Sequence, residues 1–369
     1  MMTLRERFNN IMQFKPVDRL PVFNVEGSTE QAVRMWVKNE DYPIEYDRDA
    51  FFKWDYNFFT FNCGDLPPNP PYKVEIVEKD DVTYTRRDQF GFLSKDFIGK
   101  TIGPTHNIYV GAPLSTKQEW LDMKKRYDPA TCIVRNKLTP EKTAAFNRST
   151  DPVLLGMNFG PARGVKNGYM FGFDKFMELL MDEPEIFDDM FEFWADFIIK
   201  YLELYYKDLH IDAFLFKEDG MGYNFSTMVS PTQFKKHWAP NMRKVVDYLE
   251  RKGTKTFGFY SSGNLKPIFP ALIDCGVNMT APVEVQAGMD VVELNKEFGN
   301  SMAYIGNISR QAVMDGKEAI DRELERKLDY MFEKGGFIPS IDDQIFPDMK
   351  FKDVKYCIDQ MREHVYGKK

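Results

Sequence analysis

Short apolar runs alternate with amphipathic stretches along most of this chain. Eight runs have the length and composition of buried strands, at 20–24, 56–61, 153–158, 211–216, 256–260, 278–282, 302–306 and 337–340. Between most of them, apolar residues recur every three or four positions, which predicts helices; the clearest spans 184–207. Alternating strands and helices indicate an α/β protein with a parallel sheet, and eight strands predict a closed (β/α)8 barrel, the TIM-barrel fold.

Start and stop signals place two further helices. Ser230 and Pro231 fit the N-cap and first position of a helix that ends near Gly253. The charged amphipathic stretch 315–334 predicts another helix, closed by Gly335 and Gly336. These helices separate successive predicted strands, as a barrel requires.

The interval between the second and third predicted strands is too long for one helix. It contains a Pro-rich turn and two strand-like runs, 74–77 and 82–87, with a turn signal at 79–81 between them. We therefore expect a hairpin insertion at about 66–112 within one domain that spans residues 1–369.

Acidic residues directly follow three of the predicted strands. In a barrel the strand ends ring one mouth, so these side chains are expected to converge there. Converging carboxylates would raise a pKa, hold a metal cation or bind a cationic substrate; independent, solvated loop acids are the alternative. Because adjacent strand residues point to opposite faces, at most one of Glu218 and Asp219 should face the mouth. The predicted catalytic residues are Glu218, Asp219, Tyr260, Glu284 and Asp342.

Polar residues near the same strand ends are the predicted substrate-binding groups. Arg310 can clamp a substrate carboxylate or neutralise one of the acids, with a plain surface arginine as the alternative. His106 lies in the insertion and is expected to reach over the mouth. The predicted substrate-binding set is Tyr223, Asn224, Ser262, Asn307, Arg310, Asp343 and His106.

Charge and composition exclude several classes of function. The formal net charge is −7 and no long basic run occurs, which argues against nucleic acid as a partner. No apolar run approaches the ~20 residues of a membrane span, and the charged N-terminal segment is unlike a signal sequence. The four cysteines are widely spaced without a C-x-x-C pair, as expected of reduced thiols. The sequence therefore predicts a cytoplasmic protein.

An ordered set of motifs occupies the centre of the chain. It comprises SGN at 262–264, LIDCGVN at 272–278, PVEVQAGMD at 282–290 and ELNKEFG at 293–299. In order and spacing this set resembles the uroporphyrinogen decarboxylase superfamily, which includes corrinoid-linked methyltransferases. The segment LRERFNNIMQFKPVDRLPVF at 4–23 also resembles the family's opening. The resemblance implies a (β/α)8 barrel and places Tyr260 where the family usually has histidine.

Two chemistries of that family fit the sequence poorly. The porphyrinogen decarboxylases carry an Arg-rich segment after the first strand, where this chain has Asn24 to Ser28 with Glu26 in the middle. The thiol methyltransferases hold zinc through a H-x-C pair and a further cysteine; the matching positions here are Tyr260, Ser262 and Ser340. Uroporphyrinogen is therefore an unsuitable substrate, and a thiolate zinc site is not expected.

The resemblance and the acidic strand ends together favour a methyltransferase-type enzyme. It would move a methyl group from a small donor, such as a methylated amine or aryl ether, to a corrinoid on a partner protein. A quaternary ammonium would suit carboxylates and the aromatic faces of Tyr260 and Tyr223. A decarboxylase or related lyase acting on a small acid bound by Arg310 is the alternative, and a non-catalytic binding protein is the third hypothesis. The cofactor is otherwise undetermined, and a homodimer stays open.

Overall fold

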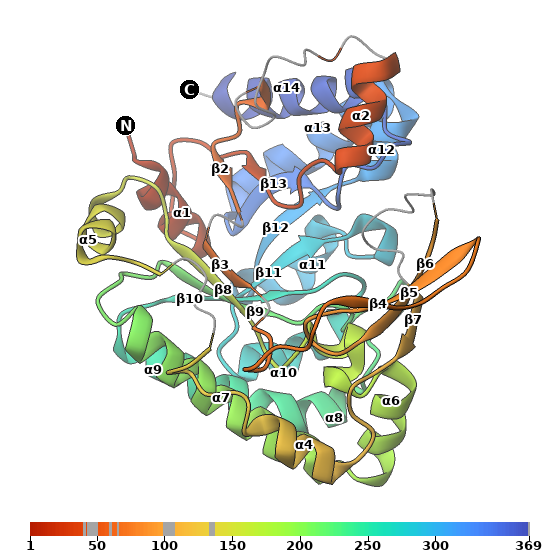
Figure 1. Ribbon diagram of the computed structural model, residues 1–369. Helices are drawn as coiled ribbons and strands as arrows, with labels where there is room; N and C mark the ends of the chain where they lie inside the picture. Colours follow the sequence, from red (N-terminus) through yellow and green to blue (C-terminus); the bar gives the residue numbers. More distant parts are fainter. Residues whose placement is uncertain are drawn as a thin grey trace.

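A seven-stranded parallel sheet forms the centre of the protein (Figure 1). The computed structural model describes residues 1–39, 42, 51–58, 61–64, 66–98, 108–132 and 137–367. The strands follow the order β13-β12-β11-β10-β9-β8-β3. Their bounds are β3 (Phe61–Gly64), β8 (Leu154–Asn158), β9 (Ala213–Lys217), β10 (Thr256–Tyr260), β11 (Met279–Val283), β12 (Ala303–Ile308) and β13 (Phe337–Ile341). The predicted α/β class with a parallel sheet is confirmed.

The first predicted strand lies beside the last one. Strands β1 (Phe23–Asn24) and β2 (Tyr56–Asn57) form a separate parallel pair, and β1 is in contact with β13. A single parallel bridge joins Ser28, after β1, to Ile345, after β13. All eight predicted runs thus contain or overlap a strand, although the strand pairs of the described residues do not form one unbroken ring.

The outer face of the sheet packs against the surrounding segments through aromatic contacts. Phe216 on β9 packs edge-on against Phe159 at 5.5 Å, and Phe159 stacks on Phe191 of α7 at 5.8 Å between ring centroids. Phe259 on β10 likewise meets Phe234 at 5.9 Å. Side chains alternate between the two faces along a strand. Leu215, which precedes Phe216, therefore points to the opposite, inner face, and so does Lys217, two residues after Leu215. Burial on both faces explains why the strands read as continuous apolar runs.

Helices flank the sheet on two sides, with α7 and α9 along one and α13 and α14 along another (Figure 1). No described helix combines the length and apolarity needed to cross a bilayer. The helices are α1 (Leu4–Met12), α2 (Glu30–Asn39), α4 (Lys117–Lys124), α5 (Pro140–Arg148), α6 (Phe173–Asp182), α7 (Glu185–Tyr205), α8 (Pro231–Gln233), α9 (Ala239–Arg251), α10 (Phe269–Asp274), α11 (Val291–Phe298), α12 (Arg310–Asp315), α13 (Lys317–Lys334) and α14 (Phe351–Gly367).

Two of the predicted helices are interrupted. The helix predicted to begin at Ser230 does so, with a capping box to Gln233, but a π-helical turn at Phe234–Trp238 separates α8 from α9. That turn lets the Trp238 indole donate a hydrogen bond to the Tyr169 hydroxyl at 2.8 Å. The helix predicted from 315 is α13, and it begins only after a break at Gly316, whose φ is +94°.

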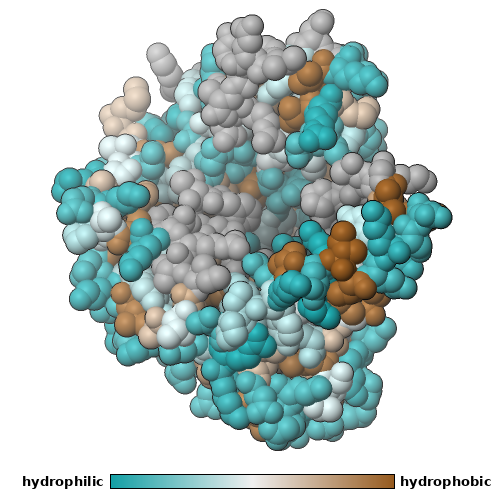
Figure 2. Space-filling view, viewed as in Figure 1, coloured by the Kyte–Doolittle hydropathy of each residue, from teal (hydrophilic) through white to brown (hydrophobic). Residues whose placement is uncertain are grey.

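The insertion is a four-stranded antiparallel sheet. The predicted hairpin is present as its first two strands, and the prediction omitted the other two. It consists of β4 (Glu75–Lys79), β5 (Thr83–Arg87), β6 (Leu93–Phe97) and β7 (Ile108–Gly111). Brown, apolar side chains gather over this sheet in Figure 2. Its large exposed apolar residues are Ile76, Val77, Phe97, Ile108, Tyr109 and Val110, with Val74, Val82 and Ile98 just beyond the strands.

Candidate functional site

A row of apolar residues fills the inner face of the sheet below the strand ends. Gly156, Leu215, Gly258 and Met279 are register partners on four neighbouring strands. A Cβ atom on Gly258 would lie 2.4 Å from the Leu215 side chain and 2.5 Å from that of Met279. Glycine is therefore required at 258, because the neighbouring side chains already occupy the interior. We call these four residues the apolar row.

A row of polar residues lies directly above the apolar row. Asn158, Lys217 and Tyr260 each follow an apolar-row position by two residues, so they project from the same face. The aliphatic stem of Lys217 passes 3.5 Å from the position that a Cβ of Gly156 would take. The Tyr260 ring lies 6.2 Å from Phe58, which follows β2, so the two rings meet across the inner face. We call Asn158, Lys217 and Tyr260 the polar row.

Four carboxylates lie beyond the strand ends and act on one another electrostatically. They are Glu26 after β1, Asp219 after β9, Glu284 after β11 and Asp343 after β13. Burial, reinforced by the charges of Asp343 and Asp219, raises the pKa of Glu26 to about 8, while Lys217 opposes the shift. We call these four residues the rim acids. Their mutual repulsion indicates that segments far apart in sequence present acids to one region.

Glu284 is held in place by a backbone donor. Its Oε2 accepts a hydrogen bond from the Gly263 amide at 3.1 Å. Burial and the charge of Asp343 raise the pKa of Glu284 to about 7, against the opposing effect of Arg310. Arg310 itself pairs with Asp343 at 2.6 Å and lies 5.5 Å from the Phe346 ring. The site thus contains an acid that gains or loses its proton near neutral pH.

Asp342, predicted to be catalytic, joins two backbone segments. Its side chain is fully buried, and its two oxygens accept hydrogen bonds from the amides of Val285 at 2.8 Å and Arg310 at 2.9 Å. Burial raises the pKa of Asp342 to about 6. These contacts tie together the segments that follow β11 and β12, and so set the positions of Glu284 and Arg310.

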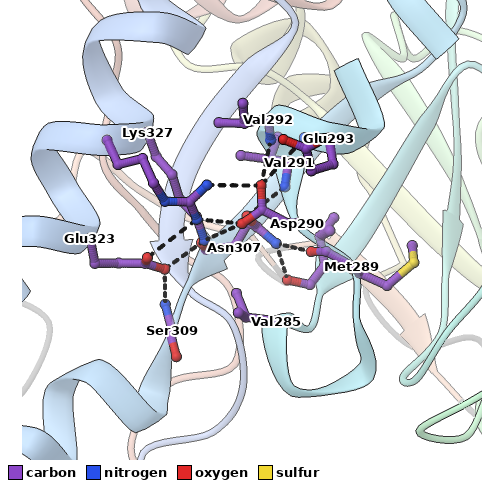
Figure 3. Close-up of polar contacts among 12 residues, drawn as sticks. Val285, Met289, Asp290, Val291, Val292, Glu293, Asn307, Ser309, Glu323 and Lys327 are labelled. Carbon is purple, nitrogen blue, oxygen red and sulfur yellow. Dashed lines mark hydrogen bonds and ion pairs between the residues drawn. The ribbon is translucent and has the colours of Figure 1, made fainter. Parts of the chain in front are cut away.

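Asn307, predicted to bind substrate, lies at the centre of a buried polar cluster (Figure 3). Its φ is +61°, and its Oδ1 accepts a hydrogen bond from the Val291 amide at 2.9 Å. The Asn307 carbonyl accepts one from the fully buried Lys327 Nζ at 2.6 Å, which also pairs with Glu323 at 2.5 Å. Asp290 of the PVEVQAGMD motif caps α11 and pairs with Arg326. This part of the motif therefore stabilises the fold.

Glu218 and Asp219 point in opposite directions, as strand alternation requires. Glu218 is fully buried on the helix side of β9, where its Oε1 accepts a hydrogen bond from the Val165 amide at 3.0 Å. Gly164 allows this approach, since a Cβ there would lie 1.8 Å from that oxygen. Burial raises the pKa of Glu218 to about 8. Asp219 is the partly exposed rim acid and pairs with Lys166 at 3.3 Å.

The other predicted substrate-binding residues lie on the surrounding loops. Tyr223 is 42% exposed and Asn224 is exposed. The Tyr223 carbonyl accepts a hydrogen bond from the Asn264 amide at 2.8 Å, which joins the loops after β9 and β10. Ser262 is half-buried in the second of these loops. His106 lies outside the described residues.

The residues at the family's zinc positions do not suit that metal. Tyr260, Ser262 and Ser340 offer only hydroxyl oxygens, and the Ser340 hydroxyl already donates to the Ile341 carbonyl at 3.2 Å. In the described part of the chain, no three His, Cys, Asp or Glu residues are placed to hold one metal ion together. The cysteines are free and buried elsewhere, at Cys63, Cys132, Cys275 and Cys357.

Sequence reasoning missed two members of the site, Glu26 and Lys217. From the sequence, Glu26 stands out only as a replacement for the arginines of porphyrinogen decarboxylases. Lys217 is the one charged residue of β9, and strand alternation places it on the same face as Leu215 and Asp219. Applying that alternation at the strand end would have identified Lys217 as an inner-face residue.

These features define a class of protein: an α/β protein with a parallel sheet and polar groups at the carboxyl ends of its strands. The profile described as "Uroporphyrinogen decarboxylase (URO-D)" matches residues 155–364, more than half of the chain. The chain belongs to the uroporphyrinogen decarboxylase family. The comparison with curated proteins gives no significant match.

Two solved structures are similar to this chain at low sequence identity. A sugar phosphate isomerase/epimerase from Parabacteroides distasonis is 10% identical, with a TM-score of 0.33, covering 65% of this chain and 82% of that one. A 3-keto-L-gulonate-6-phosphate decarboxylase from Vibrio cholerae is 11% identical, with a TM-score of 0.23, covering 58% and 86%. At these scores neither likeness bears on the activity.

Proposed function

We propose that this protein is a methyltransferase-type member of its family, which moves a methyl group from a small cationic donor to a corrinoid carried by a partner protein. The rim acids carry the proposal. Glu26 and Glu284 have raised pKa values because burial and mutual repulsion disfavour their charged forms. A bound cation would relieve that repulsion, so the rim suits a positively charged donor better than an anion.

Aromatic rings beside the rim support the same choice of donor. The rings of Tyr260 and Phe58 lie 6.2 Å apart on the inner face, below the acids. A quaternary ammonium is attracted by aromatic faces as well as by carboxylates. A methylated amine therefore matches the chemistry of this edge more closely than an aryl ether does.

Methyl transfer from such a donor breaks a carbon–nitrogen bond, and the electron pair stays on nitrogen. The methyl group passes to a nucleophilic acceptor, a role that the corrinoid would supply. The donor loses its positive charge and becomes a tertiary amine. Glu284 would hold the donor as a carboxylate; once the bond has broken and the positive charge is lost, the tertiary amine has a free electron pair and takes up a proton from solvent.

One observation supports the lyase alternative. Arg310 is paired with Asp343 at 2.6 Å, and Lys217 in the polar row is a second cation near the strand ends. Decarboxylation of an acid held there would need the developing negative charge to be stabilised by that ammonium. A non-catalytic binding protein would use the same groups without turnover.

A turnover assay separates the three hypotheses. The protein is incubated with methylated amines and a reduced free corrinoid, and the methylated corrinoid is followed by its absorption. At least one amine should be demethylated, and Glu284→Gln should lower kcat by about 10–100-fold, whereas the exposed Glu333→Gln control should not. Carbon dioxide release from small acids would instead support the lyase. Binding without turnover of any class would support the third hypothesis.

We also propose that the strands close into a (β/α)8 barrel within a single domain. The Ile345 amide donates to the Gly27 carbonyl at 3.0 Å, and the Thr29 amide donates to the Ile345 carbonyl at 3.0 Å. These bonds join the segments after β1 and β13, where a barrel would close. The contact between Tyr260 and Phe58 across the inner face also supports a curled sheet.

A further inference from the structure

The loops that follow β9 and β10 pack against each other backbone to backbone. Gly222 lies in the first loop and Gly263 in the second. A Cβ atom on Gly222 would lie 2.6 Å from the Ser262 carbonyl oxygen and 2.9 Å from the Gly263 carbonyl carbon. A Cβ atom on Gly263 would in turn lie 2.3 Å from the Gly222 carbonyl carbon. Each of these positions is closer than a side chain tolerates, so both loops require glycine at the point where they meet.

Hydrogen bonds on either side of Gly222 fix the two loops to each other. The Met221 amide donates to the Ser261 hydroxyl at 3.1 Å, and the Asn264 amide donates to the Tyr223 carbonyl at 2.8 Å. Gly222 therefore lies between two points of attachment. A side chain at this position can be accommodated only if one backbone segment moves away from the other.

The loop after β9 is a compact turn. The Tyr223 amide donates to the Ser226 carbonyl at 2.9 Å, and the Met228 amide donates to the Met221 carbonyl at 2.8 Å. Because these bonds close the turn on both sides of its tip, the turn moves as a unit. An atom added at Gly222 would therefore displace the turn from the segment that contains Gly263.

The Gly263 amide is the backbone donor that holds the Glu284 carboxylate. It donates to Oε2 at 3.1 Å. Burial and the charge of Asp343 raise the pKa of Glu284, and the Gly263 hydrogen bond opposes them because an amide donor stabilises the charged carboxylate. The other charged groups that act on Glu284 are Asp342, Arg310 and Glu26.

We propose that Gly222 is a positioning residue for Glu284: its lack of a side chain lets the two loops meet, and this contact aims the Gly263 amide at the Glu284 carboxylate. Gly222 acts through the backbone and does not need to touch the substrate. The inference rests on the proposed function, in which the charged form of Glu284 meets a cationic donor. Because the amide favours that charged form, Gly222 influences the pH range in which the site binds a cation.

Gly222→Ala tests this role without adding backbone strain, since the φ of Gly222 lies outside the left-handed region. The protein is labelled at the glutamate side-chain carboxyl carbons and titrated by NMR. The resonance of Glu284 is the one that is missing from Glu284→Gln. In parallel, the affinity for tetramethylammonium is measured by calorimetry at about pH 7 and about pH 9. Melting curves establish that each variant is folded.

Gly222→Ala should raise the pKa of Glu284 by about one pH unit, because its amide donor is displaced. Tetramethylammonium should then bind about fivefold more weakly than to the wild type at about pH 7. At about pH 9 the loss should be less than about twofold, because Glu284 is charged in both proteins.

Two control variants should leave the titration of Glu284 unchanged. Gly253→Ala introduces backbone strain after α9, where no atom lies within 4 Å of the added Cβ. Phe225→Ala changes a side chain of the same turn that is 83% exposed. The first control separates a loss of stability from a loss of position, and the second separates the surface of the turn from its backbone contact.

A folded Gly222→Ala protein in which Glu284 titrates as in the wild type would overturn the inference, whatever its loss of thermal stability. If Gly222→Ala does not fold, Ser261→Ala takes its place, because it removes the hydroxyl that binds the Met221 amide. It should raise the pKa of Glu284 in the same direction, and an unchanged titration would again overturn the inference. A wild type that does not bind tetramethylammonium at either pH would contradict the cationic donor of the proposed function, while the titration would still decide the role of Gly222.

Discussion

Lys217 on β9 and Tyr260 on β10 are register partners, so their side chains leave the same level of the same face of the sheet. The next residue, Glu218, turns toward the helices instead and is fully buried there. Because side chains alternate along a strand, Lys217 belongs to the candidate site while its neighbour Glu218 belongs to the core.

The rim acids should make the protein less stable as the pH rises. The carboxyls of Glu26 and Glu284 have folded-state pKa values of about 8 and about 7, above the ordinary 4.5, so the folded protein binds their protons more tightly than the unfolded chain does. Stability is therefore lost as the pH rises from about 4.5 to 8. Glu26→Gln or Glu284→Gln should recover on the order of 1–3 kcal/mol at high pH and little at low pH.

Urea unfolding across this pH range measures the effect. Glu333→Gln, which removes an exposed acid, serves as the control and should follow the wild type. If the rim-acid variants gained the same unfolding free energy at every pH, the gain would not come from the loss of a charge.

Gly164→Ala should destabilise the protein through one contact with Glu218. The added Cβ would lie 1.8 Å from Glu218 Oε1, at a position whose φ is +66°. The expected loss exceeds about 3 kcal/mol. Glu218→Ala alone should cost about 2–4 kcal/mol, because it leaves a cavity and an unpaired Val165 amide. The double variant should be more stable than the sum predicts by at least about 1 kcal/mol.

The Gly253→Ala variant is the control that measures the cost of backbone strain without a steric contact. Gly253 has a φ of +99° and no atom within 4 Å of an added Cβ, so alanine there should cost only about 1–2 kcal/mol. The three variants and the double variant are compared by chemical denaturation. Strict additivity of Gly164→Ala and Glu218→Ala would refute the assigned contact.

Lys327→Met should be strongly destabilising although Lys327 lies away from the polar row. The ammonium is fully buried and pairs with Glu323 at 2.5 Å and the Asn307 carbonyl at 2.6 Å. Removing it leaves the nearly buried Glu323 with only the Ser309 amide at 3.1 Å and the longer ion pair to Arg326 at 3.6 Å, and leaves the Asn307 carbonyl without this donor, at an expected cost of about 3–5 kcal/mol. Arg322→Met, on the exposed side of the same helix, should change stability by less than about 0.5 kcal/mol. Equal effects of the two variants in urea unfolding would contradict this.

Uroporphyrinogen should not be turned over. Its many carboxylates would meet the rim acids, and Glu26 stands after β1 where the porphyrinogen decarboxylases carry arginines. Carbon dioxide release is measured with the purified protein, with a porphyrinogen decarboxylase as positive control. Turnover within about 1–10³ per second, the usual range for enzymes, would show that the rim does accept a polyanion.

The strands were predictable because burial on both faces leaves a strong local signal. All eight apolar runs contain or overlap a strand, and β10 has the predicted bounds Thr256–Tyr260. Strand β7 (IYVG) was missed although its residues are apolar, whereas β6 was not predictable, because the sequence Leu93–Phe97 is LSKDF and has no apolar pattern of its own. That strand exists because it pairs antiparallel with β5 and β7, which a local pattern cannot reveal.

The sequence by itself determined the family, the order of strands and helices, and the acids that follow the strand ends, since these features are written in local composition and spacing. Only the tertiary structure decided which neighbour enters the site: Lys217 and Asp219 face the inner side, while Glu218 and Asp342 bind backbone amides in the core. It also decided the protonation of the acids. Burial and the meeting of Glu26 with distant carboxylates set those pKa values, and neither depends on local sequence.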